Sequence, residues 1–409
     1  MTQATTAQPV VTRPGRTVTA VGLLLIAANL RPAVVTLSPL MPTISADIGL
    51  SATVAGLLTT SALICFGLLA PLAPRIAHRL GLDPTLALAL GLVIAGILVR
   101  TVPSTAALFG GTVLASAGIG MGNVLLPSVI KRDFSDRPGL MTGLYSMALT
   151  GGATLAAGLV VPLTHSIGRG WRVGLVVWVG FGVVALVAWL PQLRRAKTEV
   201  PLPDEPDEGR LTTEAAAHRS IPLWHQPLAW AVTVFMGTQS LIFYAAVAWL
   251  PVYFVAHGYS ETAAGGMLAL SNAAGIVGAL SASPIAGRMR RQRALAVATA
   301  VVSLVGLVGL VLAPQAGPVW MVFLGIGPGA AISLALLFMV LRSSSSPQTA
   351  RLSGMAQSVG YLVAALGPFA IGAIHDLTGS WSVALAVLAA VALPQAAAGW
   401  VAGRGRLSR

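Results

Sequence analysis

Long apolar runs separated by short polar segments make up most of the chain. A helix that crosses a lipid bilayer needs about 20 mostly apolar residues, and twelve windows of the sequence meet that condition. The pattern therefore predicts an all-α polytopic membrane protein with twelve transmembrane helices. The expected spans are 18–43, 52–77, 84–102, 105–130, 139–164, 171–192, 225–255, 262–286, 293–313, 317–341, 352–374 and 381–402.

Composition supports this class and excludes others. Of the 409 residues, 56% are hydrophobic and only 9% are charged, whereas about 25% of the residues of a soluble domain are charged. Hydrophobicity this high also excludes a disordered chain. The one cysteine, Cys65, excludes an internal disulfide and a cysteine-based zinc site. We expect neither a metal nor a cofactor.

The net charge of +13 would suggest a nucleic-acid partner in a soluble protein, so the positions of the cations decide its meaning. With the N-terminus in the cytoplasm, 21 of the 25 Lys and Arg residues fall in cytoplasmic segments, in line with the positive-inside rule. Arg100, Arg169 and Arg172 fall on the outer side, and Arg31 falls inside a span. The charge thus predicts an inner-membrane protein with both termini in the cytoplasm, in contact with anionic lipid rather than nucleic acid.

An acidic, proline-containing segment divides the spans into six and six. It covers residues 193–224, holds half of all Asp and Glu residues and has the composition of a solvated linker. The flanking segments, 1–192 and 225–409, resemble each other at a shift of about 210 residues, for example at Gly143 and Gly354. Parallel six-helix repeats of this kind are a transporter architecture, with the substrate site near the midplane between the halves.

Two six-helix halves, a charged central loop and basic loops after the second and eighth spans resemble the major facilitator superfamily. In that superfamily the loop after span 2 usually reads G-x-x-x-D-R-x-G-R. Here Arg79 and Gly81 are kept and His78 replaces the aspartate, while the matching loop of the second half keeps Gly287 and Arg288. The resemblance implies the facilitator fold and a gating role at the cytoplasmic side for Arg79, Gly81, Gly287 and Arg288.

The stretch Asn29-Leu30-Arg31-Pro32-Ala33 in the first span is similar to the cyanate and 2-nitroimidazole transporter branch of that superfamily. The match is five residues long, and its position inside the first span strengthens the resemblance. The resemblance implies transport of a small anion or polar molecule.

Arg31 is the residue most at odds with its apolar surroundings. It lies about 13 residues, or about 20 Å, into the first span, where a cation costs about 2.5–3.5 kcal/mol. No Asp or Glu lies inside a span to neutralise it. We therefore expect the planar guanidinium to bind an anionic or strongly polar substrate. The alternatives are a structural role between helices and a contact with the carbonyl of Ala28, which Pro32 leaves without its helical N–H donor.

Other polar residues in the spans complete the predicted substrate site. Ser146 and Thr150 are four residues apart and share a helix face, and their counterparts in the eleventh span are Gln357 and Tyr361. Polar pairs at matching places suit a central cavity, although hydrogen bonds between helices explain them too. The second half has Ser240 at the place of Arg31, so the site has one cation. The remaining candidates are Asn29, Asn123, Tyr145, Gln239, Tyr244 and Asn272.

Two glycine triplets mimic phosphate-binding loops. Residues 118–122 read G-I-G-M-G and residues 325–329 read G-I-G-P-G. Neither follows a strand or precedes a Lys-Ser/Thr pair, so we interpret both as sites of close helix packing. No catalytic constellation is evident in the sequence, and we expect no enzyme activity.

The sequence thus predicts a secondary active or facilitative transporter that works by alternating access. Its small-molecule substrate would be an anion or polar compound of the cyanate or nitroimidazole kind, anchored by Arg31, and the protein would act as a monomer. One alternative is a proton-coupled multidrug efflux antiporter, which commonly carries a membrane carboxylate that this sequence lacks. Another is a membrane receptor that does not transport. Proton coupling stays open, through ionisation of the substrate itself or through His165, His257 or His375.

Overall fold

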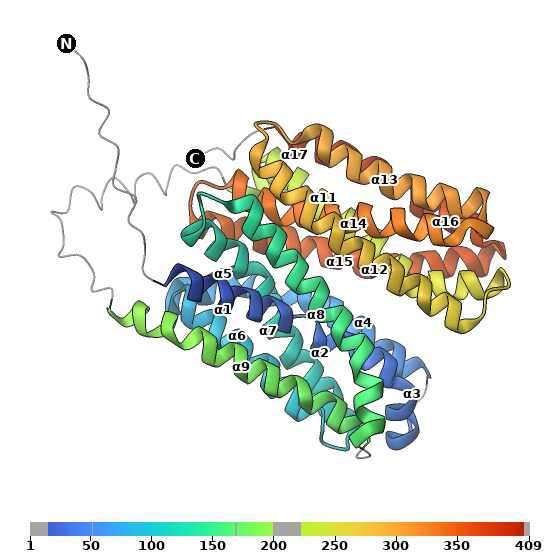
Figure 1. The fold of residues 1–409 in the computed structure, drawn as a ribbon, viewed down its shortest axis with the longest axis horizontal. Helices are drawn as coiled ribbons and strands as arrows, with labels where there is room; N and C mark the ends of the chain where they lie inside the picture. The colour runs from blue at the N-terminus through green and yellow to red at the C-terminus, as the bar shows by residue number, and fades with distance from the viewer. Residues whose placement is uncertain (1–14, 51, 168–169, 199–221, 405–409) are drawn as a thin grey trace, which may run out of the picture.

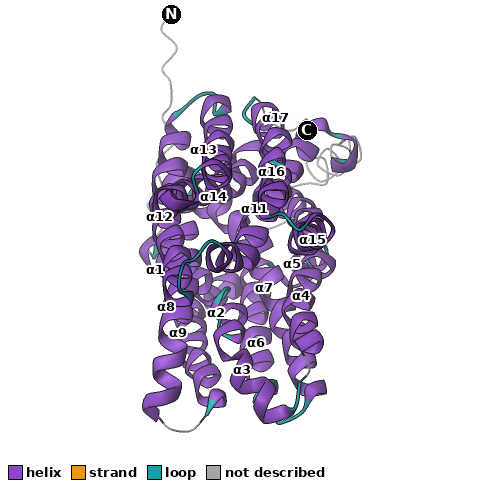
Figure 2. Ribbon diagram, turned by 90° about the vertical axis from the view of Figure 1, so that its right-hand side faces the viewer, coloured by secondary structure: helices purple, strands orange, loops and turns teal. Residues whose placement is uncertain are grey.

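The computed structural model describes residues 15–50, 52–167, 170–198 and 222–404, and every regular element in these ranges is a helix. Eleven helices are long and apolar enough to cross a membrane. The number is twelve if the bent pair Ser61–Leu69 and Leu72–Leu80 is one span. Figure 2 shows helices throughout, joined by short loops. The predicted all-α membrane fold is therefore confirmed.

The N-terminal half, drawn in blue to green in Figure 1, contains the first six spans. Its first span is interrupted twice and its second span once, so nine helices make up the described part of this half. They are α1 (Arg16–Asn29), α2 (Pro32–Val35), α3 (Leu37–Ile48), α4 (Ala52–Leu69), α5 (Leu72–Leu80), α6 (Leu82–Val99), α7 (Thr105–Asp133), α8 (Pro138–Ile167) and α9 (Trp171–Thr198).

The C-terminal half, drawn in yellow to red in Figure 1, contains the other spans. Its last span is interrupted, and two short 3₁₀ helices lie outside the spans. The elements are η1 (Leu223–His225), α11 (Pro227–Ala256), α12 (Glu261–Arg288), α13 (Arg293–Leu312), η2 (Pro314–Ala316), α14 (Gly317–Arg342), α15 (Ser346–Thr378), α16 (Trp381–Ala390) and α17 (Ala392–Ala402).

Helix covers both edges of the expected linker, 193–224, because α9 continues to Thr198 and η1 begins at Leu223. Residues 199–221 lie outside the described residues, as does Arg169.

Prolines explain the interruptions. A proline has no N–H for the carbonyl four residues earlier, and its ring crowds that carbonyl. Pro32 follows the break between α1 and α2, and Pro71 lies at the 50° bend between α4 and α5. Pro127 lies inside α7. The carbonyls that lose their helical donor belong to Ala28, Gly67 and Asn123, and each faces another helix.

The two halves lie side by side and meet mainly at one end of the bundle. This end carries the start of α1 and the ends of α9 and α17 and is called the termini end below. In Figure 1 the halves separate toward the opposite end, where α3 and the start of α12 lie.

Arg100 follows α6 at the end opposite the termini end, but its side chain does not reach the surface. Its side chain is 0% exposed. It turns into the bundle because the carbonyl of Ala33 and the hydroxyl of Thr112 accept hydrogen bonds from its guanidinium.

Arg172, in contrast, stays near the surface of the opposite end. It forms an ion pair with Asp47 at 2.9 Å, and the ring nitrogen of Trp171 donates to the same carboxylate at 3.0 Å. Hydrogen bonds from Trp171 and Arg172 hold the pKa of Asp47 below its usual value. These contacts tie α3 to α9.

Candidate functional site

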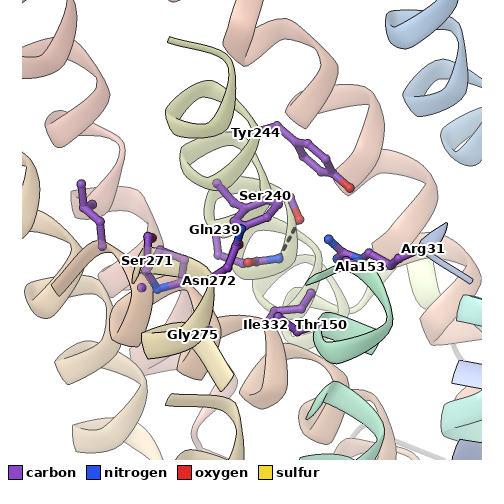
Figure 3. A pocket seen from close by; sticks show the side chains of 15 residues that line it. Arg31, Thr150, Ala153, Gln239, Ser240, Tyr244, Ser271, Asn272, Gly275 and Ile332 are labelled. Carbon is purple, nitrogen blue, oxygen red and sulfur yellow. Dashed lines mark hydrogen bonds between the residues drawn. The ribbon is translucent and has the colours of Figure 1, made fainter. Parts of the chain in front are cut away.

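A cavity between the two halves brings together side chains from α8, α11, α12, α14 and the start of α2. Its volume is about 50 Å³, which is room for a few water molecules. By the helical rise of about 1.5 Å per residue, its walls lie about 18–25 Å from the termini end, near the middle of a bilayer. Figure 3 shows polar side chains converging on it from both halves. They belong to Arg31, Thr150, Gln239, Ser240, Tyr244, Ser271 and Asn272.

Arg31 stands at the break in the first span, as the residue that precedes α2. Its guanidinium lies 5.6 Å from the centroid of the Phe243 ring, a cation–π contact between the two halves. Among the described residues, no side chain or carbonyl forms a hydrogen bond or ion pair with this guanidinium. Its five N–H donors are therefore available to a molecule that enters the cavity.

The carbonyl of Ala28 does not receive a hydrogen bond from Arg31, contrary to the alternative raised from the sequence. Gly152 of α8 packs against it, so that a Cβ at position 152 would lie 2.1 Å from the Ala28 oxygen. The carbonyl that Pro32 releases is thus covered by the backbone of α8. This close crossing of α1 and α8 lies directly beside the cavity.

One wall of the cavity comes from α11. Gln239 and Phe243 are four residues apart and therefore share a helix face. The Gln239 amide donates to the Ser240 hydroxyl at 2.6 Å and to the Met236 carbonyl at 3.2 Å, and the first of these bonds is drawn in Figure 3. The rings of Phe243 and Tyr244 meet edge to face with centroids 5.3 Å apart. This wall offers an aromatic surface and oriented polar groups without charge.

Backbone forms much of the wall from α12 and α14. A Cβ at Gly329 would lie 2.2 Å from the Gly275 oxygen, and a Cβ at Gly325 would lie 2.2 Å from the Ser271 oxygen. In the N-terminal half, Gly118 meets α6 in the same way. The interpretation of both glycine triplets as sites of close helix packing is confirmed.

A buried polar layer adjoins the cavity on the side of the termini end. Gln357 donates across the halves to the carbonyl of Asn123 at 2.8 Å, and the Tyr145 hydroxyl donates to the side-chain oxygen of Asn123 at 3.3 Å. Both Tyr145 and Tyr361 are buried. The hydrogen bond from Gln357 joins the two halves within this layer.

The predicted substrate residues fall into three groups. Those that line the cavity are Arg31, Thr150, Gln239, Tyr244 and Asn272. Those in the buried polar layer are Asn123, Tyr145, Gln357 and Tyr361, with Ser146, whose buried hydroxyl has no partner among the described residues.

Asn29 forms the third group and does not line the cavity. Its amide donates to the carbonyls of Leu25 at 2.8 Å and Phe181 at 3.4 Å. It therefore joins α1 to α9.

The sequence analysis missed Phe243, Ser271 and Ala153, which also line the cavity. Phe243 could have been found, since it follows Gln239 by one helical turn and must share its face. Ala153 carries no polar signal and emerges only from the packing of α8.

Hydrogen bonds to backbone carbonyls join the halves toward the termini end. Two of the acceptors are carbonyls that prolines leave without a helical donor. The pairs are Ser358 with Gly67 at 2.5 Å, Gln357 with Asn123 at 2.8 Å, Ser346 with Ser128 at 3.0 Å and Lys131 with Val340 at 3.1 Å.

The four predicted gating residues lie at this end but make different contacts. Gly287 touches the other half: a Cβ at Gly139 of α8 would lie 3.0 Å from the Gly287 Cα. Gly81 has a φ of +89°, a conformation that favours glycine, and it precedes α6. Arg79 and Arg288 are exposed, with no ion pair to another described residue.

Asp83 supplies a buried carboxylate in the first turn of α6. Arg132 at the end of α7 donates to both Asp83 oxygens at 2.8 Å. In the second half, Arg342 stands 210 residues after Arg132 and donates to Gln292, which stands 209 residues after Asp83. The repeat keeps the arginine and replaces the carboxylate by an amide.

We predict that Asp83→Asn lowers the stability of the folded protein by about 1–3 kcal/mol, because a buried charged hydrogen-bond partner of Arg132 is lost. The measurement is the apparent melting temperature of the purified protein in detergent. Asp136→Asn is the control, since its pair with Arg16 is half exposed and should contribute less than about 1 kcal/mol. Equal losses at the two positions would contradict the prediction.

Comparisons with known proteins support this fold. The chain matches the sequence model of the Major Facilitator Superfamily over residues 23–368. A 2-nitroimidazole transporter of Escherichia coli (strain K12) is 41% identical over 391 residues, 96% of this chain and 96% of that protein. The cyanate transport protein CynX of the same organism is 31% identical over 366 residues, 88% of this chain and 90% of that protein. The solved structure of FucP, a transporter in its outward conformation, is 13% identical, with a TM-score of 0.71 over 94% of this chain and 98% of that chain. The chain belongs to the major facilitator superfamily of membrane transporters.

Proposed function

We propose that the protein moves a small anion or strongly polar molecule, of the cyanate or nitroimidazole kind, across the inner membrane by alternating access. The observation that carries the proposal is the guanidinium of Arg31, which faces a midplane cavity without a hydrogen-bond or ion-pair partner among the described residues. The names of the 2-nitroimidazole and cyanate transporters support this substrate class.

The chemistry of the cavity favours a planar ligand with adjacent acceptor atoms. A nitro group or a carboxylate offers two oxygens that match the fork of a guanidinium. The ring of Phe243 lines the same cavity and can stack on a conjugated ligand. Gln239 and Asn272 add amide groups that can donate to or accept from a neutral polar ligand.

The way in which the halves meet supports alternating access. We assign the termini end to the cytoplasm by the positive-inside rule, so this state would be closed to the cytoplasm and open toward the outside. The buried polar layer of Asn123, Tyr145, Gln357 and Tyr361 would then be the barrier below the substrate. Rocking of the halves would break this layer and join the opposite end.

The cavity supports this proposal over a proton-coupled multidrug antiporter, because no carboxylate is among the described residues that line it. His257 and His375 lie at the opposite end and outside the cavity: Nδ1 of His257 donates to the Tyr253 carbonyl at 2.8 Å, and His375 stacks on Trp381 at 3.9 Å. The side chain of His165 lies outside the described residues. Ionisation of the substrate itself is therefore our proposed route for any proton coupling.

We predict that Arg31→Gln weakens binding of 2-nitroimidazole and of cyanate by about 10- to 100-fold, the effect of removing a charged hydrogen-bond donor. Binding is measured as the ligand-induced rise in melting temperature of the purified protein, and transport as uptake into proteoliposomes. Arg31→Lys keeps the charge but loses the fork, and we expect a smaller loss.

Arg290→Gln is the matched control, since Arg290 is an exposed cation at the termini end. It should bind both ligands as wild type does. Equal stabilisation of wild type and Arg31→Gln by both ligands would refute Arg31 as the anchor, and binding without uptake would favour a receptor.

A further inference from the structure

The fully buried guanidinium of Arg100 lies outside the cavity and has no obvious role in it. Arg100 follows the last residue of α6. Its Nε donates to the hydroxyl of Thr112 at 3.1 Å, and its Nη1 donates to the carbonyl of Ala33. The Thr112 hydroxyl donates in turn to the Leu108 carbonyl at 2.7 Å, which leaves its lone pairs for Arg100. Among the described residues the third nitrogen, Nη2, has no partner.

Burial of this cation is costly. No carboxylate pairs with it in the described part of the chain, and an arginine without a counter-charge in a membrane protein costs several kcal/mol. An arginine at the end of a span normally extends toward the headgroups. The inward direction of the Arg100 side chain therefore indicates that Arg100 maintains a specific contact inside the bundle.

The chain leaves room for this side chain. A Cβ at Gly111 would lie 2.5 Å from the Gly96 oxygen and 2.7 Å from the Cγ of Arg100, so a glycine is required where α6 and the arginine stem pack against α7. At the neighbouring Gly110 an added Cβ would meet no atom within 4 Å, and its replacement would leave Arg100 untouched.

The acceptor of the Arg100 hydrogen bond belongs to the element that carries Arg31. Helix α2, Pro32–Val35, has only four residues and is bounded by breaks on both sides, so it has little stability of its own. The N–H groups of Val34 and Val35 donate to the carbonyl of Arg31 at 3.1 and 3.0 Å. The backbone of Arg31 therefore moves together with α2.

We propose that Arg100 is a positioning residue for Arg31. It holds the Ala33 carbonyl against α6 and α7, and it thereby fixes the orientation of α2 and the direction in which the Arg31 guanidinium enters the cavity. This role rests on the proposed function of Arg31 as the substrate anchor. The hydrogen bonds of Arg100 go to Thr112 and Ala33, and neither of these residues lines the cavity.

The test uses the charge of Arg31 as its readout and needs no substrate. In a Cys65→Ala background, Ala153→Cys introduces one thiol on the cavity wall. The rates of its modification by an anionic and by a cationic methanethiosulfonate reagent are compared. Arg31→Gln should lower the ratio of the anionic to the cationic rate about tenfold, because a nearby unit charge acts in opposite directions on the two reagents.

Arg100→Lys is the decisive variant, since it keeps a cation at position 100 but cannot span Thr112 and Ala33 with one planar group. We expect the ratio to fall about threefold or more, with Gly110→Ala unchanged as the control. An unchanged ratio with a lower melting temperature would overturn the proposal and leave Arg100 as a brace of the fold. If Arg100→Lys does not fold, Thr112→Val replaces it, and an unchanged ratio there would also overturn the proposal.

The two proposals fail separately. A shifted ratio in Arg100→Lys, together with equal stabilisation of wild type and Arg31→Gln by 2-nitroimidazole, would support the positioning role and refute the proposed function. An unshifted ratio in Arg100→Lys, together with loss of stabilisation by 2-nitroimidazole in Arg31→Gln, would support the proposed function and refute the positioning role. For the positioning role, uptake by Arg100→Lys should show a raised KM with a smaller change in maximal rate.

Discussion

Replacing Gly152 by alanine is expected to push α1 away from α8 and to abolish the Arg31 cavity in its present form. The added Cβ would lie 2.1 Å from the oxygen of Ala28 and 2.9 Å from its carbonyl carbon. Both are backbone atoms at a point where the helix is already broken, so no side-chain rotation relieves the overlap. Overpacking of this kind costs about 3 kcal/mol at the upper end of its range. We expect a lower melting temperature and loss of stabilisation by 2-nitroimidazole.

Gly151→Ala is the matched control on the same helix. The adjacent glycine has nothing within 4 Å of an added Cβ, and alanine favours a helix over glycine by about 1 kcal/mol. The control should be as stable as wild type or slightly more so, with binding retained. If Gly152→Ala behaves like Gly151→Ala, the close crossing of α1 and α8 is not a feature of the protein in its membrane.

The second large effect is expected at the contact between the halves. In Gly139→Ala the added Cβ would lie 2.4 Å from the oxygen of Ser283 and 3.0 Å from the Cα of Gly287. The overlap exists only while the termini end is closed, so it destabilises that state by about 1–3 kcal/mol. The population of states open at the termini end should rise about 5- to 100-fold.

Opening at this end is measured with Ala70→Cys in the Cys65→Ala background, since Ala70 is 1% exposed and lies beside Gly354 of the other half. Gly139→Ala should raise its rate of thiol modification about tenfold. Gly287→Ala, whose Cβ meets its nearest atom at 3.0 Å, should have a smaller effect, and Gly158→Ala, with nothing within 4 Å, should have none. Any other ranking of the three variants by the rate of thiol modification would argue against closure at the termini end.

The sequence predicted the spans because twenty apolar residues can hardly be anything else in so hydrophobic a chain. It also led to Arg31, since an intramembrane cation without a carboxylate needs a polar environment. Thr150, Gln239 and Asn272 line the same cavity because they lie at similar depths in spans of both halves. Depth along a helix can be counted from the sequence.

Which neighbouring helix a side chain faces, and which helices pack together, could not be predicted in this way. Asn29 and Arg31 are close in sequence, but they face different neighbours because α1 ends between them. Tyr145 and Gln357 are polar residues at suitable depths, yet the closure of the halves buries them. The inward direction of the Arg100 side chain could not be predicted either, because the Ala33 carbonyl comes within its reach only in the folded bundle.

The two proline-released carbonyls at the closed end, those of Gly67 and Asn123, have a consequence for how the transporter responds to its surroundings. Their donors, Ser358 and Gln357, are neutral, so these bonds are insensitive to ionic strength and to protonation. These two contacts are thus kept separate from the electrostatics of the cavity, whereas Lys131, which donates to the Val340 carbonyl at the same end, is charged. If Arg31 binds the substrate as proposed, salt would change substrate capture without changing the two neutral contacts.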